Sequence, residues 1–480
     1  MIVSDAFRGK RHAVLGLARS GRATVEALLA SGASVTAWDE REEARAALLN
    51  PLPEGERDSL AQAKQGEGLL GTDPHPPTAS RRAPPSPLKG EGLELVDPLS
   101  ISLEGFDAII VSPGVPLNRH PIAAHARAAG VPVIGDIELF AQARASLPPH
   151  KVVGITGTNG KSTTTALVHH ILRTAGVPTT MGGNIGLPIL AQDPLPEGGV
   201  YVLELSSYQI DLTFSLDCDV AVLLNVTPDH LDRYETFEAY AASKGRLFEM
   251  QAEGHHHLAN PIDTNVQDLV VEKLTIEGAS VSKLQRSKVF GFFAVDHEWD
   301  QSAWPSLQGP HNAENAAAAV AVCRLLDIDD LSLQRGLRTY PGLPHRMERV
   351  AEKDGVLFVN DSKATNADST APALAAYPDI HWIVGGRAKT NDLGPCEAQL
   401  GHVRAAYTIG EAGPMFARLL EGRVPVRQSG VLDAAVKDAA NAAKPGEVVL
   451  LSPACASFDQ FRDYEHRGQA FRDAVEALGA

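Results

Sequence analysis

The stretch K-V-V-G-I-T-G-T-N-G-K-S-T-T-T-A-L-V, at residues 151–168, decides how this chain folds. Residues 151–155 are mostly apolar and predict a buried strand, and residues 162–174 predict a helix. The loop between them holds Gly157, Thr158, Asn159, Gly160, Lys161, Ser162 and Thr163. Backbone N–H groups converge where such a loop enters a helix, and the helix dipole favours negative charge there. The stretch therefore predicts a phosphate-binding loop.

Two side chains of this loop suit a nucleotide such as ATP with Mg²⁺. Lys161 is expected to reach the terminal phosphates, and the Ser162 hydroxyl is placed to meet the metal ion. The usual G-x-x-x-x-G-K-[ST] pattern is not fully met, because Ile155 stands where its first glycine is expected.

Polar side chains follow the next two apolar runs. Glu204 ends the predicted strand at 200–205, and Asp229 and His230 follow the predicted strand at 220–225. Because parallel strands end at one edge of a sheet, Glu204 is a candidate Mg²⁺ ligand and His230 a candidate metal or substrate ligand. Lys244, taken alone, is expected to be a solvent-exposed helical lysine.

Three polar loops follow predicted strands in the last third of the chain. They are N-D-S-K-A-T-N at 360–366, G-G-R-A-K at 385–389 and S-P-A-C-A-S-F-D at 452–459. Polar loops at the carboxyl ends of neighbouring strands form binding crevices in α/β proteins. Lysine and hydroxyl side chains in such loops favour a substrate that carries a carboxylate.

Strands alternate with helices throughout, which predicts an α/β fold with mainly parallel sheets. We expect three domains: a Rossmann-like domain at 1–148, a central P-loop ATPase-like domain at 149–342, and a C-terminal Rossmann-like domain at 343–480. Residues 53–92 are rich in glycine, proline and charge, and predict a flexible insertion in the first domain. The pair Gly16 and Gly21 lacks the full G-x-G-x-x-G pattern, so NAD is not supported.

Composition excludes several classes of protein. A net charge of -16 argues against nucleic acid or anionic membrane as the main partner. No apolar run approaches the roughly 20 residues of a membrane span, and the N-terminus does not read as a signal peptide. The 4 cysteines are far apart, without the spacing of a disulfide framework or zinc site. We therefore expect a cytoplasmic protein, acting as a monomer.

Taken together, the motifs resemble the Mur ligase family, and within it the branch that adds D-glutamate. The resemblance covers almost the whole chain except 53–92. It rests on these stretches: G-T-N-G-K-S-T at 157–163, G-G-N-I-G at 182–186, E-L-S-S-Y-Q at 204–209, N-V-T-P-D-H-L-D-R-Y at 225–234, H-N-A-E-N at 311–315, L-P-H-R at 343–346, N-D-S-K-A-T-N at 360–366 and S-P-A-C-A-S-F-D-Q-F at 452–461.

The resemblance implies an ATP-dependent ligase that joins D-glutamate to UDP-N-acetylmuramoyl-L-alanine through an acyl phosphate during peptidoglycan synthesis. It implies two Mg²⁺ ions, one at Ser162 and Glu204, the other at His230 and a carbamylated Lys244. Lys161, His230 and Lys244 would be catalytic. The remaining implied contacts are Gly157 to Thr163, Asn312, Asn315, Arg346 and Asp361 with ATP; Ser112, Asn184 and His230 with the UDP substrate; and Lys363, Thr365, Lys389, Ser457 and Tyr464 with D-glutamate.

Two other functions stay open at this point. The nearest is another amide ligase, either a different Mur ligase or one similar to folylpolyglutamate synthase. The other, from a different class, is an ATP-binding regulator or transporter motor without ligase chemistry. Such a protein would hydrolyse ATP without needing both an acceptor and an amino acid.

Overall fold

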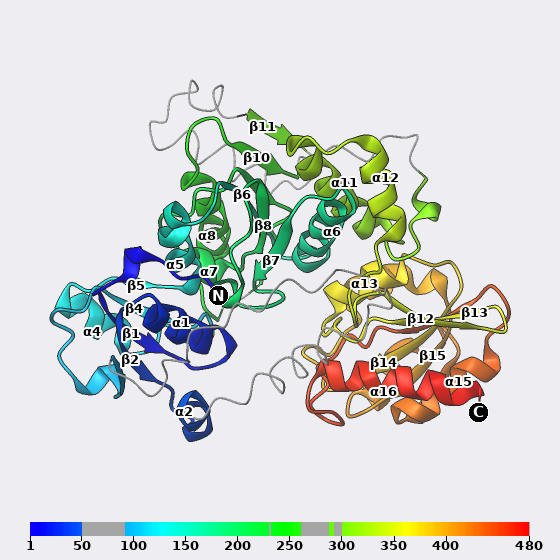
Figure 1. Ribbon diagram of the computed structural model, residues 1–480. Coiled ribbons are helices and arrows are strands. Elements are labelled where there is room, and N and C mark those ends of the chain that lie inside the picture. Colours follow the sequence, from blue (N-terminus) through cyan, green and yellow to red (C-terminus); the bar gives the residue numbers. More distant parts are fainter. Residues whose placement is uncertain (50–91, 230–231, 261–287, 292–299, 480) are drawn as a thin grey trace. The chain divides into compact units, whose positions relative to one another are not determined.

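The computed structural model describes residues 1–49, 92–229, 232–260, 288–291 and 300–479 (Figure 1). The chain divides into two compact units, Met1–Phe293 with Ala318–Gly336, and Ala294–Ala317 with Leu337–Ala480. The predicted insertion lies outside the described residues except for Gly92. Each unit is built from strands alternating with helices, so the predicted α/β class is confirmed.

The first sheet has the strand order β3-β2-β1-β4-β5, and all its neighbouring strands are parallel. This order, with the first strand central, is that of a Rossmann-like sheet. Its elements are β1 (Arg11–Leu15), α1 (Arg19–Ala30), β2 (Ser34–Trp38), α2 (Glu42–Leu49), β3 (Leu93–Leu95), β4 (Ala108–Val111), α4 (Ile122–Ala129), β5 (Val133–Ile134) and α5 (Asp136–Ala143).

The second sheet belongs to the same unit and has the order β11-β10-β9-β6-β8-β7, again with parallel neighbours. Its strands and the following helices are β6 (His150–Thr156), α6 (Lys161–Thr174), β7 (Thr179–Gly183), β8 (Gly199–Glu204), α7 (Ser207–Asp211), β9 (Val220–Leu223), α8 (Phe237–Glu249), β10 (His256–Ala259), β11 (Lys288–Gly291), α11 (Pro310–Leu325) and α12 (Asp330–Thr339).

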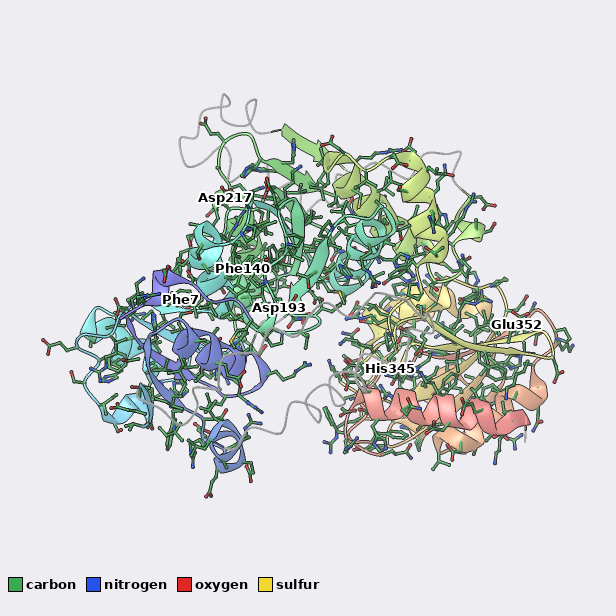
Figure 2. All side chains as sticks on the ribbon, in the orientation of Figure 1. Phe7, Phe140, Asp193, Asp217, His345 and Glu352 are labelled. Atoms are coloured by element: carbon green, nitrogen blue, oxygen red, sulfur yellow. The ribbon has the colours of Figure 1, made fainter. Side chains whose placement is uncertain are left out.

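One hydrophobic core joins these two sheets into a single unit. Phe140 of α5 (Figure 2) meets the ring of Tyr201 of β8 edge-on, with centroids 5.1 Å apart. Glu138, also on α5, accepts hydrogen bonds from the backbone amides of Phe214 and Ser215 at 2.7 and 2.9 Å. These contacts pack α5, which follows the first sheet, against β8 and the segment after α7.

The third sheet lies in the second unit and has the order β12-β13-β17-β14-β15-β16. Only β12, among its described strands, runs antiparallel to its neighbour. Its elements are β12 (Glu348–Lys353), β13 (Val356–Asn360), α13 (Ala367–Leu374), β14 (Ile380–Gly385), β15 (Val403–Ile409), α14 (Gly413–Leu420), β16 (Val426–Gly430), α15 (Leu432–Ala442), β17 (Val448–Leu451) and α16 (Tyr464–Glu476).

Helices cover both faces of this third sheet. Trp382 of β14 belongs to the hydrophobic cluster formed with α13 and α14, whereas its neighbour Ile383 belongs to the cluster formed with α15 and α16. This alternation follows from the two-residue period of a strand. A sheet buried on both faces presents its loops as the accessible edge, which is where the polar motifs lie.

Within the described residues, no helix combines the length and the apolar character that a membrane span requires.

Candidate active site

The predicted phosphate loop connects β6 to α6 and is held open by backbone geometry. Gly157 has φ 151 and Gly160 has φ 81, conformations that favour glycine. A Cβ added at Gly157 would lie 3.0 Å from Cβ of Leu224 and 3.3 Å from the Asn225 amide. Gly160, the residue before α6, gives the helix no side-chain cap, and the N-terminus of a helix favours a negatively charged ligand.

Asn225, at the end of the neighbouring strand, holds the loop in place. Its carbonyl accepts from the Thr158 amide at 2.9 Å, and its Oδ1 accepts from the Asn159 amide at 2.8 Å. Its Nδ2 donates back to the Asn159 carbonyl at 3.2 Å. Asn225 has no role among the predicted site residues, although its position directly after a buried strand is a signal for one. The loop is therefore preorganised by side-chain and backbone contacts from β9.

Two lysines converge on one carbonyl of this loop. Lys161 Nζ donates to the Gly157 carbonyl at 2.9 Å and to the Thr158 carbonyl at 2.8 Å. Lys244 Nζ donates to the same Gly157 carbonyl at 2.8 Å. Lys244 is only 2% exposed, so the prediction of a solvated helical lysine is wrong. Burial, and then the charge of Lys161, hold the pKa of Lys244 well below its ordinary value, although Asp229 and Asp211 act in the opposite direction.

Glu204 ends β8 beside the loop, because β8 pairs with β6 in the register Ile155 to Glu204. Its side chain is buried, and Oε1 accepts from Nδ2 of Asn184 at 3.1 Å. Its Oε2 is also buried and accepts no hydrogen bond from the residues that the structure describes. A buried carboxylate oxygen without a partner is costly, and Mg²⁺ would satisfy it.

The protein ligands available for a metal are few. Ser162 is buried in the first turn of α6, next to the loop. Among the residues that the structure describes, His, Cys, Asp and Glu side chains form no group of three or more with metal-binding spacing. Mg²⁺ commonly binds one or two protein groups together with water and phosphate, so Ser162 and Glu204 fit such a site. His230 lies outside the described residues.

The loops after β1, β2 and β4 form a second polar edge in the same unit. Ser112 Oγ donates to the Gly16 carbonyl at 2.9 Å, and Gly16 has φ 91. Asp39 accepts from the Leu17 amide at 2.7 Å and from Nε of Arg41 at 3.1 Å. Burial opposes ionisation of Asp39, but these hydrogen bonds hold its pKa below the ordinary value. These contacts bring Ser112, Gly16 and Asp39 together at one edge of the first sheet.

Hydrogen bonds from Arg233 and Arg119 connect this edge to the loop that follows β9. Arg233 donates to the carbonyls of Val115 and Gly114 at 3.2 and 3.0 Å, and its guanidinium lies 4.5 Å from the Tyr208 ring centroid. From the other side, Arg119 donates to the Asp232 carbonyl at 3.2 Å. The loop containing Ser112 is therefore tied to the one between β9 and α8.

In the second unit, the three predicted polar loops meet at one edge of the sheet. Asp361 donates its amide to the Leu451 carbonyl at 2.7 Å, and Ser452 Oγ donates to Asp361 Oδ2 at 2.8 Å. The backbones of Arg387 and Ala456 exchange hydrogen bonds of 2.8 and 3.0 Å. The side chains of Lys363, Thr365, Lys389 and Ser457 lie on these loops, with Ser457 buried and Lys389 exposed.

Arg467 of α16 braces two of these loops, and the sequence analysis missed it. Its Nε donates to Ser362 Oγ at 3.0 Å and its Nη2 to the Ser362 carbonyl at 2.8 Å. Its Nη1 donates to the Cys455 carbonyl at 3.1 Å. The side chain is 1% exposed. No local pattern marks an arginine whose acceptors at Ser362 lie 105 residues earlier in the chain.

Asn312 and Asn315 lie in the first turns of α11 and form one small network. Asn315 Nδ2 donates to Asn312 Oδ1 at 3.1 Å, and Asn312 Nδ2 donates to the Gln308 carbonyl at 3.0 Å. Both side chains are buried. They belong to the same unit as Arg346 and Asp361.

His345 (Figure 2) and Met347 form a strained turn beside Asp361. Their φ values are 61 and 47, and His345 Nδ1 lies 3.0 Å from Nδ2 of Asn360. A Cβ added at Gly468 would lie 2.1 Å from His345 Nδ1, so only glycine fits there. The turn places the Met347 amide 3.2 Å from Asp361 Oδ1, to which it donates.

Burial raises the pKa of Asp361 to about 7, against the hydrogen bonds from Ser452 and Met347 and the charges of Arg346 and Arg467. The unfolded chain ionises this group near pH 4. Between those values the unfolded state binds fewer protons than the folded state, so this group makes stability fall as pH rises. As pH rises from 5 to 8, the free energy of unfolding of the wild type should fall by about 3 kcal/mol relative to that of Asp361→Asn, which lacks the titrating group. Urea unfolding at both pH values measures this, and a difference independent of pH contradicts it.

Comparison with known proteins agrees with this arrangement. Residues 155–323 match the family model described as Mur ligase middle domain, and residues 345–455 match Mur ligase, glutamate ligase domain. The UDP-N-acetylmuramoylalanine--D-glutamate ligase of Novosphingobium aromaticivorans is 58% identical over 479 residues, covering 100% of this chain and 97% of the relative. The ligase of the same name from Sphingopyxis alaskensis is 55% identical over 485 residues, covering 100% of both.

Solved structures share the fold at low sequence identity. The MurF ligase from Thermotoga maritima in complex with ADP aligns with a TM-score of 0.55 and 18% identity, over 99% of this chain and 97% of that chain. The UDP-N-acetylmuramate-alanine ligase MurC from Thermotoga maritima aligns with a TM-score of 0.54 and 16% identity, over 98% of this chain and 99% of that chain. Because full-length relatives are 58% and 55% identical and two family models match most of the chain, the chain belongs to the Mur ligase family.

Proposed function

We propose that the chain joins D-glutamate to UDP-N-acetylmuramoyl-L-alanine at the expense of ATP, giving ADP and phosphate in peptidoglycan precursor synthesis. The observation that carries the proposal is the preformed loop at 157–163, which Lys161 contacts through two carbonyls, together with the buried, half-satisfied carboxylate of Glu204 at the end of the neighbouring strand β8. The names of full-length relatives, UDP-N-acetylmuramoylalanine--D-glutamate ligase, support the choice of acceptor and amino acid.

The reaction is proposed to run in two steps. The alanyl carboxylate of the acceptor attacks the γ-phosphorus of ATP, forming an acyl phosphate and releasing ADP. The amine of D-glutamate then attacks the acyl carbon, and the tetrahedral intermediate collapses to the amide and expels phosphate. A free carboxylate is a poor acylating agent, so the phosphoryl group supplies the leaving group. The protein contributes positioning and charge neutralisation.

The residues of the loop act on the phosphates. Backbone amides of 157–163 would hold the phosphates at the start of α6, and Lys161 would exchange its loop carbonyls for phosphate oxygens. When bound, Mg²⁺ would offset the negative charge that accumulates between phosphate and carboxylate. Ser162 and Glu204 would hold one ion, and His230 with Lys244 a second.

The other substrate contacts are proposed for the polar loops at the carboxyl ends of the three sheets. Ser112 and the Gly16 loop would take the uridine diphosphate, and Asn184 with His230 the muramoyl part. The other assignments are Asn312, Asn315, Arg346 and Asp361 for ATP, and Lys363, Thr365, Lys389, Ser457 and Tyr464 for D-glutamate. Domains at 1–148, 149–342 and 343–480 would each carry one substrate. We further propose a cytoplasmic monomer, which suits the four buried free cysteines.

The test is phosphate release from ATP with Mg²⁺, UDP-N-acetylmuramoyl-L-alanine and either D- or L-glutamate. The proposal predicts release only when the acceptor and the D-isomer are both present. Release with a different amino acid would support another amide ligase, including a folylpolyglutamate synthase-like one. Release that needs neither acceptor nor amino acid would support an ATP-driven regulator or motor.

Lys244 is proposed to carry a carboxylate made from its own amine. A lysine must be neutral to attack carbon dioxide, and burial with the charge of Lys161 lowers the pKa of Lys244 well below its ordinary value. The amine would add to carbon dioxide and lose one proton, which gives a carbamate. That group would supply an anionic metal ligand in place of a cation.

We expect Lys244→Ala to lose activity by about 100-fold or more, because a metal ligand is removed. A short carboxylic acid such as acetate should restore part of the activity, whereas bicarbonate should not. Steady-state phosphate release with and without each additive measures this. Full activity of Lys244→Ala without any additive contradicts the assignment.

A further inference from the structure

Lys363, in the loop after β13, forms a chain of hydrogen bonds with Tyr464 and Glu465 at the start of α16. Lys363 Nζ donates to the hydroxyl of Tyr464 at 2.8 Å, and that hydroxyl donates to Oε1 of Glu465 at 3.2 Å. The ammonium also lies 4.3 Å from the centroid of the Tyr464 ring. The hydroxyl thus accepts from the lysine and donates to the carboxylate, which uses both of its roles.

The Tyr464 ring is itself held by neighbouring groups. The backbone carbonyl of Tyr464 accepts a hydrogen bond from Ser362 Oγ at 2.8 Å, and Ser362 Oγ accepts one from Arg467 Nε at 3.0 Å. The ring of His345 meets the Tyr464 ring edge-on, with centroids 6.2 Å apart and an interplanar angle of 79°. A side chain anchored at its backbone and packed at its ring offers a fixed hydroxyl position.

The Tyr464 hydroxyl must stay protonated to donate its hydrogen bond to Glu465 while it accepts one from Lys363. Burial, with the nearby Glu465 acting in the same direction, raises the pKa of Tyr464 to about 12. The phenol therefore stays neutral at working pH and keeps its donated hydrogen bond to Glu465. An ammonium has three N–H donors, and the contact to Tyr464 uses one of them while fixing where the group lies.

We propose that the Tyr464 hydroxyl is a positioning group that holds the Lys363 ammonium for a carboxylate of the incoming acidic amino acid. This inference rests on the proposed function, since it takes the loop at 360–366 to be part of the amino-acid site. The two parts of the Tyr464 side chain then have separate roles. The ring packs against His345, and the hydroxyl orients the Lys363 ammonium that would bind the substrate.

Tyr464→Phe removes the hydroxyl and keeps the ring. We expect the KM for D-glutamate to rise about 10-fold, the size of one charge-assisted hydrogen bond. The kcat should change less than about 2-fold, and the KM values for ATP and the UDP acceptor should not change. Tyr407→Phe is the matched control, because it also removes a tyrosine hydroxyl from this sheet, one that lies 2.9 Å from His381 Nδ1. The control should leave all three KM values unchanged.

A double-mutant comparison with Lys363→Met separates positioning from a general structural effect. If the hydroxyl acts through Lys363, Tyr464→Phe should have no further effect on D-glutamate in the Lys363→Met background. Titration of all four proteins with D-glutamate, followed by NMR, makes the same comparison without turnover.

The other outcomes are distinguishable. Additive effects of the two substitutions overturn the inference, as does an unchanged KM in Tyr464→Phe when Lys363→Met raises it; the proposed function survives both results. If Lys363→Met itself leaves D-glutamate affinity unchanged, the loop is not part of the amino-acid site, and both the inference and that part of the proposed function fail.

Discussion

Replacing Lys161 by alanine is expected to lower kcat about 1000-fold or more while the protein remains folded. The ammonium already contacts the carbonyls of Gly157 and Thr158, so it lies where phosphate oxygens would replace them. Removing one preorganised charge stabiliser costs two to three orders of magnitude in comparable sites, roughly 3–4 kcal/mol. The free energy of unfolding should change by less than about 1 kcal/mol.

Lys151→Ala is the matched control for this experiment. Lys151 is exposed at the amino end of the same strand, β6, and shares its charge without lying in the loop. Phosphate release and urea unfolding are measured for both variants. Near-normal turnover in Lys161→Ala would mean that the loop does not handle the transferred phosphate.

Arg467→Met should destabilise the second unit by about 3 kcal/mol and lower turnover about 100-fold. The substitution leaves the Ser362 carbonyl, Ser362 Oγ and the Cys455 carbonyl without their buried donor, and each unsatisfied buried group costs about 1–3 kcal/mol. Burial lowers the pKa of Arg467 to about 10, so the group stays charged at neutral pH. Loops displaced by 1 Å lose about two orders of magnitude in rate.

Arg462→Met is the control, because Arg462 is exposed just before α16. Thermal unfolding and phosphate release are compared for the two variants. A stability loss in Arg467→Met no larger than in Arg462→Met would show that the brace contributes nothing to the loops.

Buried runs of sequence predicted the central strands well. The sequence predicts strands at 34–38, 108–111, 356–360 and 448–451, and β2, β4, β13 and β17 have these bounds. Continuous apolar residues are needed when both faces of a sheet are covered. The apolar run at 13–17 predicts the first strand, but β1 spans Arg11–Leu15. Gly16 ends it, because its φ of 91 turns the chain, and the buried His12 before it carried no apolar signal.

Edge strands were not predictable in the same way. The strand β7 reads T-T-M-G-G and β16 reads V-R-Q-S-G, and both are half-exposed. Neither shows an apolar run or a clean alternation, because pairing with β8 and β15 supplies the backbone hydrogen bonds. Their strand state depends on the neighbouring strand rather than on their own residues.

The candidate site shows the same contrast between features encoded by contiguous residues and features that depend on distant ones. The phosphate loop was predictable because its strand, glycines, lysine and helix are contiguous in sequence. The burial of Lys244 was not, since it arises where α8 packs over the Gly157 carbonyl, 87 residues away. Arg467 and Asn225 were missed for the same reason: their roles lie in hydrogen bonds to distant loops.

The most direct test of the account follows oxygen from the acceptor to the released phosphate. UDP-N-acetylmuramoyl-L-alanine labelled with ¹⁸O in its alanyl carboxylate is turned over with ATP and D-glutamate, and the phosphate is analysed by mass spectrometry. Attack of that carboxylate on ATP at the 157–163 loop predicts one ¹⁸O atom in each phosphate released. Phosphate that carries no label while amide is formed would contradict the acyl phosphate, and with it the role given to the loop.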